Sequence, residues 1–243
     1  MSLRLDTWLA QHHLVESREK ARLAIRQGLV RVNGMIATKP AQEVRETDVV
    51  VLEKPPLAYV SQGGLKLETA IREFGLDFQG KRILDLGAST GGFTDCALQH
   101  GAARVYAVDV GTDQLHPSLR ADARVRAYEG LHVRDLGPEH LEGQPVDWIV
   151  IDVSFISLTK VLPFLPSLLA PGGQLVILVK PQFELEAKKA FKGGIVKSDK
   201  WRQFALERVL ACARELGFQV KGITQTEVAD PGKKNVEFLL WLG

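Results

Sequence analysis

The first 55 residues carry helical periodicity and then strand periodicity. Apolar positions recur at helical spacing over Leu3–Ala10 and again over Arg18–Gln27, which predicts two short amphipathic helices. Ser17 has the side chain of an N-cap for the second helix, and Gly28 is a typical helix stop. These two helices open the chain.

A hairpin and a third strand are predicted next. Asn33-Gly34 separates two apolar-rich runs within Leu29–Ala37, and this dipeptide is a strong signal for a two-residue hairpin turn. Asp48–Leu52 has the pattern of a further strand, and the Pro55-Pro56 pair cannot continue a helix or a strand ladder. We therefore expect a small α+β domain over residues 1–55, a linker over 56–60 and a second domain over 61–243.

In the second domain, strand-like runs alternate with helical segments. The strand-like runs are Arg82–Asp85, Arg104–Asp109, Val125–Glu129, Asp147–Asp152 and Gln174–Lys180. Helices are predicted over Gly92–Gln99, Leu158–Leu169 and Lys200–Leu216, and two further strands over 218–226 and 235–242. Such alternation predicts an α/β, Rossmann-like fold with a mostly parallel seven-stranded sheet covered on both faces. A closing hairpin of this kind is typical of the methyltransferase variant of the fold.

Composition excludes several classes of protein. The chain is 45% hydrophobic and 25% charged with a net charge of +2, so overall charge predicts no partner. Cys96 and Cys212 lie far apart and form no metal-binding pair, and the six histidines are scattered, so we expect no metal. No apolar run approaches the roughly 18 residues that span a bilayer, and the N-terminus lacks a signal-peptide pattern. We expect a cytoplasmic protein with no membrane association and no obligate protein partner.

A basic stripe follows the second predicted helix. Arg18, Arg22 and Arg26 recur every four residues and share one face. Residues 1–40 hold seven Arg and Lys against three Asp and Glu. Such a stripe suits RNA phosphates, although a merely solvated helix face would carry the same charges. The predicted RNA contacts are Arg4, Ser17, Arg18, Lys20, Arg22 and Arg26.

A glycine-rich turn predicts the cofactor. The segment Ile83–Thr94 is a strand, a turn and a helix start, and its glycines are not spaced as GxGxxG. A dinucleotide needs no carboxylate at the strand end, whereas Asp85 could balance the ammonium and sulfonium of S-adenosylmethionine. Asp109 ends the next strand and could accept ribose hydroxyls, which fits NAD equally well. The predicted cofactor contacts are Asp85, Gly87, Ser89, Thr90, Gly91, Gly92, Phe93, Asp109 and Glu129, the last of which could equally be a surface residue.

Two charged residues end neighbouring strands at the edge where such sheets bind their substrates. Asp152 ends the fourth strand and Lys180 the fifth, so both are expected beside the glycine turn. Lys66 begins the helix before the first strand, and Glu237 opens the last strand. A solvated strand end explains either charge alone, but a pair of opposite charges there indicates a functional site.

These four residues resemble the Lys-Asp-Lys-Glu tetrad of the FtsJ/RrmJ-like ribose 2′-O-methyltransferases. The surrounding words SQGGLKLETA, DLGASTGGFTD, YAVDVGTDQL, DVSFISL, LVKPQFE and NVEFLLWL resemble the TlyA family of rRNA cytidine 2′-O-methyltransferases, often labelled hemolysins. SREKARLAIRQGLVRVNG resembles the RNA-binding module named for ribosomal protein S-four. The resemblance covers essentially the whole chain. It implies that ribosomal RNA or a ribosomal subunit is the partner, with the large subunit favoured. Gln62 stands where that family commonly has Arg, which removes one potential phosphate contact.

A ribose hydroxyl is a poor nucleophile at neutral pH, so it needs an activating group. We expect Lys180 to act as the general base, while Lys66 weakens its hold on the proton and orients the ribose. Asp152 would fix the ammonium groups, and Glu237 would steer Lys66 and the hydroxyl. The loop 181–199 is predicted to be a basic flap over RNA, through Lys188, Lys189 and Lys192, or else a solvated loop.

Features of the sequence oppose three other functions. A nicotinamide-dependent reductase is opposed by Asp85, the missing GxGxxG and the closing hairpin. A membrane-lytic toxin is opposed by the lack of a strongly amphipathic apolar segment. A non-catalytic RNA-binding protein is opposed by the intact tetrad.

Overall fold

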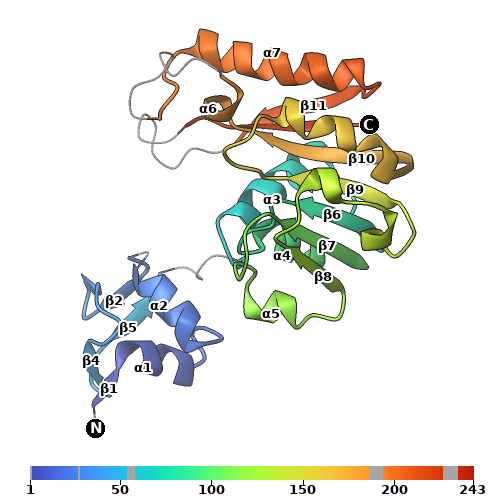
Figure 1. The fold of residues 1–243 in the computed structure, drawn as a ribbon. Coiled ribbons are helices and arrows are strands. Elements are labelled where there is room, and N and C mark those ends of the chain that lie inside the picture. Colours follow the sequence, from blue (N-terminus) through green and yellow to red (C-terminus); the bar gives the residue numbers. More distant parts are fainter. Residues whose placement is uncertain (1, 27, 54–57, 186–193, 227–234) are drawn as a thin grey trace. The chain divides into compact units, whose positions relative to one another are not determined.

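The computed structural model describes residues 2–26, 28–53, 58–185, 194–226 and 235–243. The chain divides into two compact units, Met1–Ala58 and Tyr59–Gly243 (Figure 1). Within the described residues, no helix combines the length and apolar character that crossing a membrane requires.

The first unit packs two helices against short strands around its own apolar cluster. The helices are α1 (Leu5–Gln11) and α2 (Arg18–Arg26). A three-stranded sheet contains β3 (Met35–Ile36), β2 (Val30–Val32) and β5 (Val50–Leu52), and β1 (Ser2–Arg4) pairs with β4 (Glu43–Arg45). The predicted helix start at Leu3 is wrong, because Ser2–Arg4 is extended and pairs with the distant β4.

The predicted hairpin turn is confirmed. Asn33 and Gly34 both have positive φ, 52° and 82°, as a type I′ turn requires. The Asn33 side chain also fixes the neighbouring chain, because its amide donates to Asp48 at 2.9 Å and its oxygen accepts the Val49 N–H at 2.8 Å. The turn therefore aligns β2 with both β3 and β5.

The second unit contains the predicted seven-stranded, mostly parallel sheet. Its strands are β6 (Arg82–Leu86), β7 (Arg104–Asp109), β8 (Val125–Glu129), β9 (Val146–Ile151), β10 (Leu169–Val179), β11 (Val220–Gln225) and β12 (Phe238–Leu242). Their order is β11-β12-β10-β9-β6-β7-β8. Strand β12 runs antiparallel to both β10 and β11, which confirms the closing hairpin. The strands after β6 are added first on one side of it, as β7 and β8, and then on the other side, as β9, so the ends of β6 and β9 border one crevice.

Helices cover both faces of this sheet (Figure 1). On one face lie α3 (Gly63–Phe74) and α4 (Gly92–Gln99), and on the other lie α7 (Asp199–Glu215) and three 3₁₀ turns, η3 (Leu158–Lys160), η4 (Leu162–Phe164) and η5 (Pro166–Leu168). The predicted helix over Leu158–Leu169 is wrong. Pro163 and Pro166 remove backbone donors within it, and the segment breaks into short turns instead.

Short helices complete the connections around the sheet. They are η1 (Val133–Asp135), η2 (Pro138–Leu141), α5 (Pro117–Arg120) and α6 (Pro181–Glu184). The last of these follows β10 directly and carries the residues just after Lys180.

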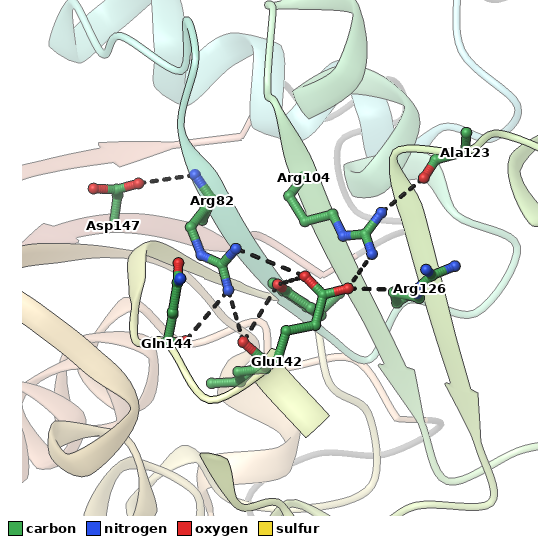
Figure 2. Close-up of polar contacts among 9 residues, drawn as sticks. Arg82, Arg104, Ala123, Arg126, Glu142, Gln144 and Asp147 are labelled. Atoms are coloured by element: carbon green, nitrogen blue, oxygen red, sulfur yellow. Dashed lines mark hydrogen bonds and ion pairs between the residues drawn. The ribbon is translucent and has the colours of Figure 1, made fainter. Parts of the chain in front are cut away.

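An ion-pair cluster fastens the amino-terminal ends of β6, β7 and β8 (Figure 2). Arg82, Arg104 and Arg126 converge on Glu142, at the end of η2, and the Tyr106 hydroxyl donates to the same carboxylate at 2.9 Å. The hydrogen bond from Arg104 lowers the pKa of Glu142. The cluster lies at the edge opposite the strand ends that form the candidate site. We interpret it as a structural clamp.

Candidate active site

A cavity of about 470 Å³ opens at the carboxyl ends of β6, β7 and β9. This volume lies within the range of small-ligand sites. Of the predicted cofactor contacts, Gly87, Ser89 and Asp109 line it, together with the tetrad residue Asp152. Further lining residues that the sequence analysis missed are Val110, Gln114, Leu131, His132, Val153, Ser154 and Phe155. Several of them follow directly after the acidic ends of β7 and β9, which is the signal that could have identified them.

Gly87 allows the glycine turn to approach the end of β9. Its φ is +83°, and a Cβ at this position would lie 2.7 Å from the carbonyl oxygen of Asp152. No other residue type fits both constraints. The glycine therefore determines how closely the cofactor turn and Asp152 can lie.

Asp109 joins the glycine turn to the loop after β7. One carboxylate oxygen accepts the Ser89 N–H at 2.8 Å and the other accepts the Gly111 N–H at 2.7 Å. A carboxylate offers about four lone-pair sites, so acceptor capacity remains for ligand hydroxyls. Asp109 is thus held in place and still able to bind.

Asp85 lies beneath the turn and not in the cavity wall. Strand periodicity points its side chain to the face that α4 covers, where it is fully buried and accepts a hydrogen bond from Thr94 Oγ1 at 2.6 Å. Burial raises the pKa of Asp85 to about 7, and the nearby charge of Asp152 adds to the effect. Asp85 is not among the residues that line the cavity, and its expected contact with the cofactor stays a prediction.

The remaining predicted cofactor contacts support the turn from outside the cavity. Gly92 packs closely on the start of α3, since a Cβ there would lie 2.2 Å from Ser61 Oγ. Phe93 is buried in the cluster between α3 and the sheet, and Gly91 has φ +95°. Thr90 is exposed on the turn, with its carbonyl accepting the His116 N–H at 3.2 Å.

Glu129 clamps the loop that follows β7. Its carboxylate accepts from the backbone N–H groups of Asp113, Gln114 and Leu115, at 3.1, 3.0 and 3.2 Å, and from Arg120. The Arg120 hydrogen bond is the largest cause that lowers the pKa of Glu129, to about 2. Because Gln114 lines the cavity, Glu129 shapes the cavity through this loop.

The four tetrad residues form one continuous chain of contacts. Lys180 Nζ lies 2.5 Å from Asp152 Oδ1, and Lys66 Nζ lies 4.0 Å from Asp152 Oδ2 and 2.7 Å from Glu237 Oε2. Their side chains are between 10% and 28% exposed, so the charges are mostly withdrawn from water while still accessible to a substrate. The expected proximity of Lys180 and Asp152 beside the glycine turn is confirmed.

An aromatic pair stands next to Lys180. Phe155 is 91% exposed and has φ +66°, a strained conformation for an aromatic residue. Its ring centroid lies 5.1 Å from that of Phe183, and Lys180 Nζ lies 6.0 Å from the Phe183 centroid. Lys180 also donates to Ser154 Oγ at 2.9 Å. Neither phenylalanine was predicted as a site residue, although both occur in the motifs DVSFISL and LVKPQFE.

In the first unit, three of the predicted RNA-binding arginines surround one buried carboxylate. Asp6 is fully buried and lies 3.1 Å from Arg4, 3.4 Å from Arg18 and 3.1 Å from Arg22. The hydrogen bonds from Arg4 are the largest cause that holds the pKa of Asp6 well below its usual range. Each arginine side chain is about half exposed, so the outer guanidinium edges face solvent.

The other predicted RNA contacts differ in their surroundings. Ser17 caps α2, since its Oγ accepts the Lys20 N–H at 3.2 Å, and Lys20 pairs with Glu16 at 2.7 Å. Arg26 is exposed in the last turn of α2. Lys188, Lys189 and Lys192 lie outside the described residues. Among the residues that are described, no group of three or more His, Cys, Asp or Glu side chains could hold a metal ion.

Comparisons with known proteins give the family. Residues 59–243 match the FtsJ-like methyltransferase model, and residues 3–50 match the S4 domain. Over 98% of its length the chain is 42% identical to the 16S/23S rRNA (cytidine-2′-O)-methyltransferase TlyA of Mycobacterium tuberculosis, of which it covers 89%. Over 82% of its length it is 34% identical to the 23S rRNA (cytidine-2′-O)-methyltransferase TlyA of Campylobacter jejuni, of which it covers 77%.

A solved structure agrees with the sequence matches. A hemolysin-like protein of Streptococcus thermophilus is 42% identical and has a TM-score of 0.76, over 99% of this chain and 88% of that chain. The fold, the assembled tetrad and these matches lead to one conclusion. The chain belongs to the FtsJ-like methyltransferase family and carries an S4 domain before its methyltransferase domain.

Proposed function

We propose that the chain is an S-adenosylmethionine-dependent methyltransferase that modifies the ribose 2′-hydroxyl of a cytidine in ribosomal RNA. The observation that carries this proposal is the continuous contact of Glu237, Lys66, Asp152 and Lys180, a chain that reaches the cavity through Asp152. A non-catalytic RNA-binding relic has no need of such an arrangement. The substrate follows the names of the relatives, and the large subunit is favoured because both named TlyA relatives act on 23S rRNA.

The residues of the cavity fit the proposed cofactor. Asp109 retains acceptor capacity for ribose hydroxyls, and the turn at Gly87 and Ser89 offers close backbone approach. The negative charge of Asp109 and Asp152 on the lining suits a cationic ligand. S-adenosylmethionine, when bound, supplies an electrophilic methyl group on its sulfonium.

Each tetrad residue has a proposed role in preparing the hydroxyl. Lys180, 2.5 Å from Asp152, is placed to bind the ribose hydroxyl. Once its ammonium has given a proton to water, the neutral amine can receive the hydroxyl proton. Asp152 fixes the Lys180 ammonium, and Glu237 fixes Lys66. Lys66 orients the ribose. Alignment of the hydroxyl in this partly desolvated cleft supplies much of the acceleration.

The aromatic pair suits a nucleotide substrate. Phe155 exposes nearly its whole ring beside the cavity, against Phe183. Aromatic faces stack unpaired bases in RNA-binding proteins. A cytidine stacked there would have its ribose near Lys180. The arginines around Asp6 would contact the RNA backbone from the S4 domain.

Methyl transfer to purified ribosomal subunits and to deproteinised rRNA tests this function. The protein should transfer a labelled methyl group from S-adenosylmethionine to 23S rRNA, and nuclease digestion with mass spectrometry should identify 2′-O-methylcytidine. Label on a base, on protein only, or on no acceptor would contradict the proposal.

A further inference from the structure

Two loops carry the catalytic pair, and they are joined at several points. Residues 152–158 follow β9, and residues 180–184 follow β10. Lys180 contacts Asp152 and Ser154, and Phe183 packs against Phe155. These contacts hold the two loops together at the end nearest the cavity.

Glu184 joins the same two loops at their far end. It is 2% exposed, and both of its carboxylate oxygens are used on the other loop. Oε2 accepts from Ser157 Oγ at 2.5 Å, and Oε1 accepts the Leu158 N–H at 2.8 Å. The main chain of Glu184 is held in turn by α7, because Arg208 donates to its carbonyl oxygen at 3.1 Å.

Space filling alone does not account for this carboxyl group. A buried carboxyl costs desolvation, which raises the pKa of Glu184, and an apolar side chain would fill the position without that cost. What the carboxylate adds is a two-point connection that fixes the 152–158 loop against the 180–184 loop. Ser157 also caps η3 through the Thr159 N–H, so the connection sets where that turn begins.

We infer that Glu184 is a positioning residue for methyl transfer, one that keeps the Asp152 and Lys180 loops in register without touching the substrate. The inference rests on the proposed function. Removing the Glu184 carboxylate would leave the Leu158 N–H unpaired in the interior and free the loop that carries Ser154 and Phe155. The geometry of the reacting hydroxyl depends on these loops, so the loss should be much larger in kcat than in RNA or cofactor binding.

Three variants separate positioning from stability. Glu184→Leu fills the position with an apolar side chain and removes both acceptors. Glu184→Gln keeps an acceptor for Leu158 N–H and can donate to Ser157 Oγ, so this variant should retain activity. Val125→Ala truncates a buried side chain at the start of β8, away from both loops, and serves as a control for lowered stability.

The test measures kcat and KM on rRNA, cofactor affinity by calorimetry, thermal unfolding, and hydrogen exchange of peptides spanning 152–160. Glu184→Leu should lower kcat at least about tenfold and speed exchange of these peptides, with KM and cofactor affinity within about threefold. Glu184→Gln and Val125→Ala should keep kcat within about threefold. Should Glu184→Leu not fold, Ser157→Ala should lower kcat at least about threefold and speed the same exchange.

Unchanged kcat and exchange in the folded Glu184→Leu protein would overturn the inference. If Glu184→Gln lost as much kcat as Glu184→Leu, the hydrogen-bonding role would be overturned. If Val125→Ala lost as much, lowered stability alone would explain the effect and the positioning role would be overturned. If the wild-type protein methylates no rRNA, the proposed function fails. The exchange measurement needs no substrate and still tests whether Glu184 holds the loops.

Discussion

The buried carboxyl of Asp85 illustrates what a motif does and does not determine about one residue. The motif correctly places an acidic side chain at the glycine turn. Which face of the sheet it points to depends on the register of β6 and the cover from α4, neither of which is encoded within the motif. Burial raises the pKa of Asp85 to about 7, so this carboxyl group is partly protonated near neutral pH.

The protonation of Asp85 should be coupled to cofactor binding. If Asp85 balances a cation at the turn, binding favours its carboxylate and releases a proton, so affinity should rise as the pH increases towards about 7 and level off above that value. Calorimetry in buffers of different ionisation enthalpy measures this release. In Asp85→Asn this pH dependence should disappear, and an identical dependence in both proteins would contradict the coupling.

Two of the four tetrad residues were predictable because strand ends in a parallel sheet meet at one edge. Lys180 and Asp152 could be paired from their position at neighbouring strand ends, while Lys66 and Glu237 were recognised through a family resemblance. Glu129 and Glu184 could not be assigned in this way. Their partners are backbone N–H groups of loops, and no sequence pattern specifies those loop conformations.

At the scale of elements, Gly87 of the glycine turn can be compared with Gly80, which lies before β6. Gly87 and Gly80 both have positive φ, 83° and 70°, but only at Gly87 would a Cβ meet other atoms, the nearest being the Asp152 carbonyl oxygen. Gly80→Ala should therefore cost only the backbone strain, about 1 kcal/mol. Gly87→Ala should cost more and also weaken cofactor binding at least about tenfold, because the turn must move away from β9.

Thermal unfolding and calorimetry on the two glycine variants check this prediction. Equal cofactor affinity in both variants would show that the close approach at Gly87 does not shape the site.

The helices α1 and α2 are connected through Asp6, and substituting this residue should show whether RNA binding becomes tighter or weaker. Asp6→Asn adds one unit of positive charge, so charge alone predicts tighter RNA binding. If Asp6 instead orients Arg4, Arg18 and Arg22, binding should weaken by roughly three- to tenfold. Glu46→Gln makes the same charge change at an exposed position of this unit and should bind RNA as tightly as wild type or slightly more.

RNA affinity at several salt concentrations distinguishes the two accounts, with thermal unfolding as the check on folding. Tighter binding by Asp6→Asn would show that the carboxylate only offsets charge.

The elements themselves could be largely predicted from apolar periodicity, and the exceptions have physical causes. Proline broke the expected helix at Leu158–Leu169, and the non-local pairing of β1 with β4 displaced the start of α1. Strand β10 begins at Leu169, earlier than predicted, through glycine-containing residues whose pairing with β9 shifts register. Periodicity reports burial within a segment. The proline effect is local and could be read from the sequence, whereas the pairings of β1 and β10 depend on partners far away in the chain.

At the scale of the whole molecule, each unit has its own apolar core and its own candidate chemistry. The arginines around Asp6 belong to the first unit, and the tetrad belongs to the second. Changes at Asp6 should therefore alter KM for RNA with little effect on cofactor affinity, whereas changes in the tetrad should alter kcat.

The most direct test of the account is methyl transfer to rRNA by Lys180→Met, measured beside cofactor binding. Met keeps much of the lysine stem and removes the ammonium. The account predicts unchanged cofactor affinity within about threefold and a loss of turnover far beyond about tenfold, since the group that receives the proton is gone. Turnover within about tenfold of wild type, with the cofactor bound normally, would contradict the assignment of Lys180 and with it the catalytic role of the tetrad.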